Sequence, residues 1–223
     1  AGVELAKKTF NPRLGIEGGI SVLGTSGIVI PMSEAALVAS LRLEMKMLVE
    51  GGGSYLVITP GNYGQAFSKE QTQLNLTYSM KCSNYVGETL DMARELGVKG
   101  ILFIAHFGKF LKVAGGIMNT HSKEGDARME LLAAGVVRAG GSMDTLRGIL
   151  NCRVTEEALG IIQGESPELL RKSMDAVMDR ILYYLSKRAG EELPVECILY
   201  SNEFGLLAAS PGAMDMLEEL RKG

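Results

Sequence analysis

Two histidines, His106 and His121, are the side chains in this sequence best suited to moving a proton or orienting a polar ligand. His106 follows the apolar stretch 100–105 and precedes Phe-Gly-Lys, and His121 lies between a threonine and a serine. We predict that both lie where a sheet gives way to loops, and that they act by positioning or hydrogen bonding. A purely structural role for each is the alternative. With no cysteine nearby they are too few for a closed zinc site, so no metal centre is predicted.

A glycine-rich segment at 15–27 is the second candidate for chemistry. It contains a short apolar run, 20–23, and leads towards a helix that Ser33 can cap. Glycine lets a backbone approach a ligand closely, and a glycine-lined strand end before a helix is a usual place for an anionic or nucleotide-like ligand. Residues 60–64 form a second glycine-bearing loop after an apolar run. A tight turn that serves only the sheet is the alternative for the first segment.

Several well-known signatures are absent from the sequence. It contains no Gly-x-Gly-x-x-Gly, no Gly-x-Ser-x-Gly and no His-Glu-x-x-His, and Gly108-Lys109 lacks the other residues of a phosphate-binding P-loop. The three cysteines are far apart and odd in number, which fits neither a disulfide framework nor a metal cluster. We therefore expect a reducing, cytoplasmic location.

Composition narrows the classes further. The chain has 223 residues and is 46% hydrophobic, which is enough for one substantial core. Its net charge is −3, so no global field attracts nucleic acid or acidic lipid, and any anionic ligand must be held by local cations. No apolar run approaches the length of a membrane span. We predict no nucleic-acid or membrane partner, and a homo-oligomer stays open.

Hydrophobic periodicity predicts alternating strands and helices. We predict strands at 20–23, 55–59, 74–80, 100–105 and 197–201, and helices that start near Ser33, Asn84, Met129, Met143, Thr155, Ser166 and Ser210. This alternation favours an α/β fold with an open, mostly parallel, Rossmann-like sheet and helices on both faces. The four consecutive helices between 126 and 189 are more than one crossover needs, so we predict that they form an extra helical layer on one side of the sheet.

The order of motifs resembles one family. The resemblance rests on segments 8–29, 31–34, 59–64, 83–87, 106–109, 119–122 and 126–130. Together they are similar to the CbiD family, the cobalt-precorrin-5B (C1)-methyltransferases of anaerobic cobalamin (vitamin B12) synthesis. The resemblance implies transfer of a methyl group from S-adenosylmethionine to carbon 1 of a cobalt corrinoid. It also implies that residues 1–14 connect to a missing N-terminal domain and that 15–223 form the Rossmann-like domain.

The resemblance and the chemistry together assign candidate residues. Methyl transfer needs donor and acceptor carbon to be held close with water excluded, and it needs no nucleophilic side chain. The catalytic candidates are His106 and His121. The cofactor-binding candidates are Gly18, Gly19, Gly24, Thr25, Ser26, Gly27, Gly61, Asn62 and Gly64. The substrate-binding candidates, chosen to hold the carboxylates of the macrocycle and its polar edges, are Arg13, Lys109, Lys112, Asn119, Ser122, Asp126 and Arg128.

Other interpretations remain. Asp126 and Arg128 are equally explained as a helix cap and a surface charge. The whole chain can also be a non-catalytic corrinoid- or nucleotide-binding module, and a nicotinamide-dependent reductase is disfavoured by the missing fingerprint. The second predicted strand ends without the acidic residue that ordinary Rossmann methyltransferases use to hold a ribose.

Overall fold

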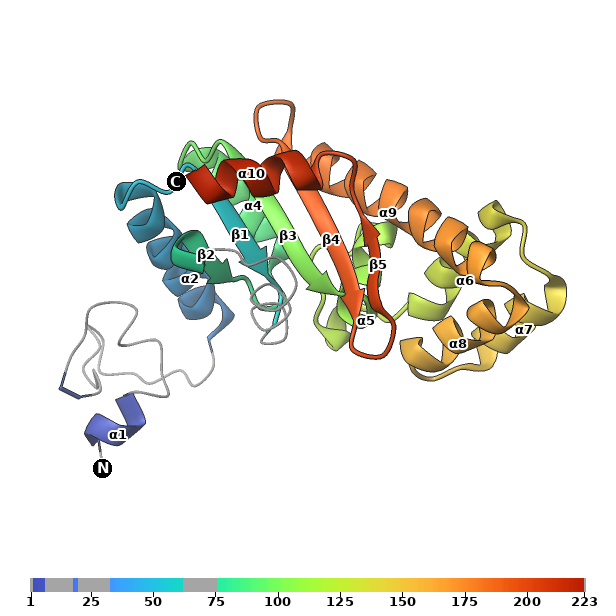
Figure 1. Cartoon of the computed structure of the whole chain (residues 1–223). Coiled ribbons are helices and arrows are strands. Elements are labelled where there is room, and N and C mark those ends of the chain that lie inside the picture. The colour runs from blue at the N-terminus through green and yellow to red at the C-terminus, as the bar shows by residue number, and fades with distance from the viewer. Residues whose placement is uncertain (1, 7–17, 20–32, 62–75, 223) are drawn as a thin grey trace.

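The computed structural model describes residues 2–6, 18–19, 33–61 and 76–222, and the structural statements below concern these residues. Its centre is a five-stranded sheet with the strand order β2-β1-β3-β4-β5 (Figure 1). The strands are β1 (Tyr55–Thr59), β2 (Ser79–Lys81), β3 (Gly100–His106), β4 (Val195–Ser201) and β5 (Gly205–Ala209). The predicted strand at 20–23 lies outside the described residues.

Four of the five strands are parallel. β1 pairs in parallel with β2 and β3, β3 pairs in parallel with β4, and only β5 is antiparallel to its neighbour. The carboxyl ends of β1, β2, β3 and β4 therefore meet at one edge of the sheet, where α5 lies (Figure 1). The prediction of an open, mostly parallel α/β sheet is confirmed.

Helices cover both faces of the sheet. The helical segments are α1 (Gly2–Ala6), α2 (Glu34–Glu50), η3 (Leu76–Tyr78), α4 (Val86–Glu95), α5 (Phe107–Phe110), η4 (Leu111–Gly115), η5 (Ser122–Glu124), α6 (Arg128–Ala139), α7 (Met143–Asn151), α8 (Thr155–Glu165), α9 (Pro167–Ala189) and α10 (Ala213–Lys222). α10 packs on β1, β3 and β4 from one face (Figure 1), while α9 packs on β4 and β5 from the other and α2 packs against β2. None of the helices in the described residues combines the length and the hydropathy of a membrane span.

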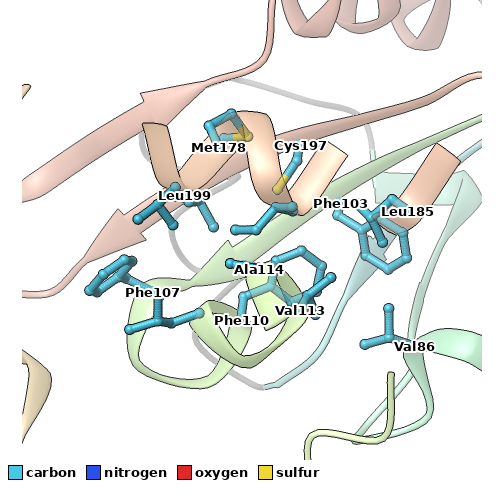
Figure 2. Close-up of a cluster of buried hydrophobic side chains, with 14 of the residues drawn as sticks. Val86, Phe103, Phe107, Phe110, Val113, Ala114, Met178, Leu185, Cys197 and Leu199 are labelled. Carbon is cyan, nitrogen blue, oxygen red and sulfur yellow. The ribbon is translucent and has the colours of Figure 1, made fainter. Parts of the chain in front are cut away.

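The alternation of side chains along β3 divides the core between the two faces. Leu102 and Ile104 pack with α10, whereas Ile101 and Phe103 belong to the larger core that also contains α9. β3 then continues into α5 and η4, which tuck under this second face. Figure 2 shows Phe110 and Val113 of these short helices pointing toward Phe103, with Met178 and Leu185 of α9 beyond. The rings of Phe103 and Phe110 have their centroids 5.3 Å apart. This packing fixes α5 and η4, the segment that directly follows His106.

The extra helical layer is present, and α9 is its link to the sheet. Its buried face includes a regular apolar stripe made of Leu170, Met174, Val177, Ile181 and Leu185. α6 and α8 pack on α9, and α7 packs on α6 and α8, so that α6, α7 and α8 lie to the side of the sheet (Figure 1). These helices add few contacts with the strands, but the start of α8 reaches α5.

Three local predictions were wrong. The predicted strand at 74–80 is a strand only from Ser79, because Leu76–Tyr78 form a 3₁₀ turn whose Tyr78 hydroxyl donates to the Gly51 carbonyl at the end of α2 (3.0 Å). Residues 74 and 75 lie outside the described part. Asn84 does not cap the helix that was predicted to start near it, because α4 begins at Val86 with Tyr85 as its N-cap and has no side-chain cap. The Asn84 carbonyl accepts from the Thr120 amide (2.9 Å).

The third error is the missed strand β5. Its sequence, Gly-Leu-Leu-Ala-Ala, has none of the β-branched residues that favour strands. The chain reverses because the Ser201 hydroxyl oxygen accepts from the amides of Glu203 and Phe204, and Gly205 takes a positive φ of 66°. A five-residue edge strand then returns along β4.

Candidate functional site

A cavity of about 390 Å³ lies beside the carboxyl end of β3. Its walls come from β3, α5, η4, the loop before α6 and the start of α8. The side chains that carry charge or can titrate are His106, Lys109, Lys112, Asp126, Arg128 and Glu156. With His106 neutral, three cations face two carboxylates. The cavity is therefore net positive in a protein whose net charge is −3, which favours an anionic ligand.

His106 is held in one orientation at the end of β3. The Gly108 amide donates to Nδ1 of His106 (3.2 Å), so the proton of the neutral ring belongs on Nε2. Nε2 faces Oε1 of Glu156 at 3.4 Å, and the edge of the ring meets Tyr200 with centroids 5.5 Å apart. The imidazole therefore presents a defined N–H to a carboxylate at the rim of the cavity.

Glu156 reaches this histidine because α8 begins close to the end of β3. The Thr155 hydroxyl donates to Oε2 of Glu156 (2.8 Å), which leaves Oε1 directed at His106. A carboxylate in the first turn of a helix is favoured by the helix dipole. The approach requires Gly108, because a Cβ built there would lie 2.8 Å from the Thr155 hydroxyl oxygen. Gly108 thus permits the contact between the carboxyl edge of the sheet and the start of α8.

Lys109 ties two loops to the sheet edge. Its ammonium donates to the carbonyls of Pro60 (3.1 Å) and Ser83 (3.4 Å), which follow β1 and β2. Burial lowers the pKa of Lys109, and the charge of Lys112 acts in the same direction. The neighbouring Cys82 is a thiol at neutral pH, because burial raises its pKa to about 12. Lys109 is therefore engaged with the backbone and directs less of its charge into the cavity.

Asp126 and Arg128 form a bidentate pair. Nε and Nη2 of Arg128 each donate to a different Asp126 oxygen, both at 2.7 Å. These hydrogen bonds lower the pKa of Asp126 to about 2 and raise that of Arg128. The forked edge of this guanidinium is thus occupied within the protein. A ligand carboxylate has access only to the remaining N–H groups unless it displaces Asp126.

The cavity brings together part of the predicted set. His106, Lys109, Lys112, Ser122, Asp126 and Arg128 line it, whereas His121 and Asn119 do not. Nδ1 of His121 accepts from the Lys123 amide (3.1 Å), and Oδ1 of Asn119 accepts from the His121 amide (3.1 Å). Both side chains hold their own loop, which Lys123 fastens to the start of α2 through an ion pair with Glu34. Their predicted roles stay predictions.

Most of the predicted cofactor residues cannot be placed. Gly24, Thr25, Ser26, Gly27, Asn62, Gly64 and the substrate candidate Arg13 lie outside the described residues. Gly18, Gly19 and Gly61 are described, and a Cβ built at any of them meets no atom of another described residue within 4 Å. Gly61 is exposed directly after β1, so no described residue blocks the approach of a ligand to the backbone at this point of the sheet edge.

Three polar side chains of the cavity were missed by the sequence analysis, namely those of Thr120, Thr155 and Glu156. Thr155-Glu156-Glu157 opens a helix that was predicted, and acidic residues there are the ordinary complement to a helix dipole. Nothing local distinguishes such a residue from one that reaches a site. Within the described ranges there is no group of three or more His, Cys, Asp or Glu side chains that could hold a metal ion.

Comparison with known proteins identifies the family. The family model described as "CbiD, C-terminal domain" matches residues 119–211, and the model described as "CbiD" matches residues 1–31. The chain belongs to the CbiD family. Several curated relatives named cobalt-precorrin-5B C(1)-methyltransferase match almost all of it. The relative from Ruminiclostridium cellulolyticum is 41% identical over 99% of this chain and 58% of its own length.

Two further relatives give the same picture. Those from Clostridioides difficile and Listeria monocytogenes are 40% and 35% identical, over 97% and 99% of this chain. They are covered over 53% and 59% of their own lengths, so the chain spans little more than half of the curated relatives. No solved structure matches it. The matched C-terminal region includes Thr120 and Asp126 in the loop before α6, Arg128 at the start of α6, and the start of α8.

Proposed function

We propose that this chain serves in the methylation of carbon 1 of cobalt-precorrin-5B by S-adenosylmethionine, a step of anaerobic cobalamin biosynthesis. The observation that carries the proposal is the match of 97–99% of the chain to curated relatives that bear the name of this methyltransferase. The cavity supports it independently, because open α/β sheets bind their ligands outside the carboxyl ends of parallel strands.

The chemistry asks for placement more than for a reactive side chain. S-adenosylmethionine supplies an electrophilic methyl group on a sulfonium, and its displacement needs the two reacting carbons to be brought into line with water excluded. In the described part, the open backbone at Gly61 after β1 suits a close approach by the donor. Lys109 holds that loop against the sheet through the carbonyl of Pro60. The glycine and hydroxyl candidates at 24–27 and 62–64 complete the proposed donor site.

His106 and Glu156 provide the polar side of the reaction space. The ring of His106 is fixed by the Gly108 amide on one nitrogen and by Glu156 on the other, and Glu156 is fixed by Thr155. A carboxylate that accepts from Thr155, faces Nε2 of His106 and still lines the cavity can orient a polar group of the substrate or accept a proton from it. We assign His106 and Glu156 to this role.

The size of the cavity limits what enters it. Pockets for small molecules have volumes of roughly 300–1,000 Å³, and 390 Å³ is at the low end. A corrinoid with its peripheral acid chains is larger than the molecules that fill such pockets. We infer that the macrocycle lies across the mouth of the cavity and inserts part of its periphery, with Lys112 and the remaining N–H groups of Arg128 facing its carboxylates.

The proposal extends to the setting of the protein. We infer a cytoplasmic location, supported by three buried cysteines that are all unpaired. The division into a connecting segment at 1–14 and an α/β domain from 15 onward stays a proposal, since most of 1–32 lies outside the described residues. Self-association likewise stays a proposal.

Calorimetry on this chain tests the proposed function. A methyltransferase domain should bind S-adenosylhomocysteine, whereas a corrinoid carrier should bind a cobalt corrinoid without it. A nucleotide-binding module should bind adenosine nucleotides as well as S-adenosylhomocysteine. The Gly61→Val variant should weaken S-adenosylhomocysteine binding by tenfold or more while the thermal midpoint stays within a few degrees, and equal affinity in parent and variant would place the donor elsewhere.

A further inference from the structure

Two buried polar groups at the inner wall of the cavity have more hydrogen-bonding capacity than the protein uses. The side chain of Lys112 is on η4, and the residue is only 5% exposed. Among the described residues its ammonium makes one hydrogen bond, a long one of 3.4 Å to the carbonyl of Thr120. An ammonium has three donors. Two of them therefore have no protein acceptor in the described part of the chain.

Thr120 is the second group. It is 4% exposed and lines the same cavity, and its hydroxyl oxygen has no hydrogen-bond partner among the described residues. Buried hydroxyls are normally paired, since leaving one unpaired destabilises the fold. The backbone of Thr120 is well held, because its amide donates to the Asn84 carbonyl (2.9 Å). The unpaired hydroxyl is therefore not explained by a loosely placed loop.

The charges around Lys112 point to the kind of ligand. Asp126 interacts electrostatically with Lys112, but both oxygens of this carboxylate already accept hydrogen bonds from Arg128. Lys109 adds a like charge nearby. A buried ammonium needs a counter-charge. An ammonium and a hydroxyl that share one wall can both donate to the two oxygens of a single carboxylate.

We propose that Lys112 and Thr120 form a subsite for one carboxylate of a bound ligand, which approaches through the cavity between them and Arg128. The proposal rests on the proposed function for its two candidate sources. One is a peripheral acetate or propionate of the corrinoid, and the other is the carboxylate of the methionine part of S-adenosylmethionine.

Thr120→Val is the decisive variant, because it keeps the shape of the side chain and removes only the hydroxyl. If the hydroxyl serves the ligand, the variant should bind about tenfold more weakly while its thermal midpoint stays equal or rises. A structural hydroxyl would give the opposite result. Lys112→Met, which keeps most of the buried stem, should weaken the same ligand by about tenfold to a hundredfold. Ser173→Ala removes another buried hydroxyl, on α9 away from the cavity, that also has no partner in the described part of the chain. This variant should leave every affinity unchanged.

The ligands separate the two sources. A cobalt corrinoid with free acid chains is compared with its fully esterified form, and S-adenosylhomocysteine with 5′-methylthioadenosine, which lacks the carboxylate. If Thr120→Val weakens the free acid corrinoid and not the ester, the subsite holds a substrate acid. If it weakens S-adenosylhomocysteine and not 5′-methylthioadenosine, the subsite holds the cofactor. Unchanged affinity for all four in both cavity variants overturns the subsite.

Propionate distinguishes failure of the subsite from failure of the proposed function. In NMR titrations of the parent chain at millimolar propionate, the Thr120 methyl and the Lys112 side-chain signals should shift, and Lys112→Met should abolish the Thr120 shift. Propionate binding here without any corrinoid or S-adenosylhomocysteine binding would retain the subsite and reject the proposed function. Corrinoid or cofactor binding that both variants leave intact would retain the function and reject the subsite.

Discussion

Side chains at the end of β3 and side chains at the starts of α6 and α8 line the same cavity, but they are held in place in different ways. His106 ends β3 and Lys109 lies just beyond it in α5, and both are fixed by backbone groups, namely the Gly108 amide and the carbonyls of Pro60 and Ser83. Arg128 and Glu156 begin helices α6 and α8 and are fixed by side chains. Side chains held by backbone groups keep their place as long as the sheet is intact. The positions of Arg128 and Glu156 also depend on how the extra helical layer packs against the sheet.

This difference assigns a task to the helices beyond the sheet. A parallel sheet can position residues only at its strand ends, and here those residues are a histidine and a lysine already bonded to the backbone. The acidic group that faces His106 comes from a helix that is connected to the sheet mainly through α9. The extra helical layer therefore completes the site from the side, and the following predictions test how closely the two regions depend on each other.

The largest expected effect concerns the core that the two regions share. Phe103 of β3 and Ile149 of α7 are both fully buried in one continuous apolar cluster. Phe103→Ala should destabilise the protein by about 3–5 kcal/mol and Ile149→Ala by about 2–5 kcal/mol. Because the core is continuous, each variant should unfold in a single transition that lowers near- and far-ultraviolet circular dichroism together. The exposed Val137→Ala is the control, and separate transitions for Ile149→Ala would show that the helical group unfolds independently.

The next effect concerns Lys109, which belongs to the sheet side. Lys109→Met removes the donor from two loop carbonyls and should destabilise the protein by about 1.5–3 kcal/mol, the range for hydrogen bonds from a charged group. Hydrogen exchange should increase in the loops after β1 and β2 and stay unchanged in α7. Lys46→Met, at an exposed lysine 3.6 Å from Glu50, should change stability by less than about 0.5 kcal/mol. Unaltered stability and exchange in Lys109→Met would mean that this lysine is available to a ligand instead.

The sheet was predictable from the sequence because buried parallel strands leave a plain signal. The run 100–105 is apolar throughout, and Ser33 and Ser166 each cap the helix expected of them, with their side-chain oxygens accepting from Ala36 and Leu169. β5 left no such signal, because an edge strand of small and unbranched residues is defined by its partner and its turn. The same holds at 76–78, where a tyrosine contact with α2 overrides an alternating pattern.

The sequence predicted the site residues only where they lie close together along the chain. His106, Lys109 and Lys112 lie within one short segment after β3, so the position of the strand sets all three. Glu156 is fifty residues away, and its approach depends on the absence of a Cβ at Gly108 and on the packing of α8. Arg128 was predicted as a clamp for a substrate carboxylate, and its pairing with Asp126 could not be distinguished in the sequence from an ordinary helix start.

A smaller effect should follow from a side chain that crowds the contact between the end of β3 and the start of α8. Gly108→Ala places a methyl group 2.8 Å from the Thr155 hydroxyl oxygen and should destabilise the protein by about 1–3 kcal/mol through overpacking. Thr155→Ala removes the atom that it meets, so the double variant should recover most of that loss. NMR signals of the His106 ring should move in Gly108→Ala and return towards the parent in the double variant. Additive losses without recovery would place the strain elsewhere.

The smallest effect concerns Asp126, which pairs the loop with the start of α6. Its pKa of about 2 lies below the ordinary 3.8, so the pair stabilises the folded state above pH 4, and this contribution is lost as the pH falls from about 4 to 2. The Asp126 side chain is 47% exposed, so solvent screening limits the contribution to about 1 kcal/mol or less. Asp126→Asn should therefore be slightly less stable than the parent at pH 7 and equally stable near pH 2. Asp144→Asn, at a carboxylate that is 95% exposed, should show no such convergence.

The Asp126→Asn variant also reports on the ligand, because it releases the forked edge of Arg128 from its carboxylate. If that edge grips the corrinoid only after Asp126 moves away, Asp126→Asn should bind the acid corrinoid more tightly than the parent and the ester equally well. If the affinity for the acid form instead falls together with stability, Asp126 is needed to hold Arg128 in place, and the arginine meets its ligand through the N–H groups that Asp126 leaves unoccupied.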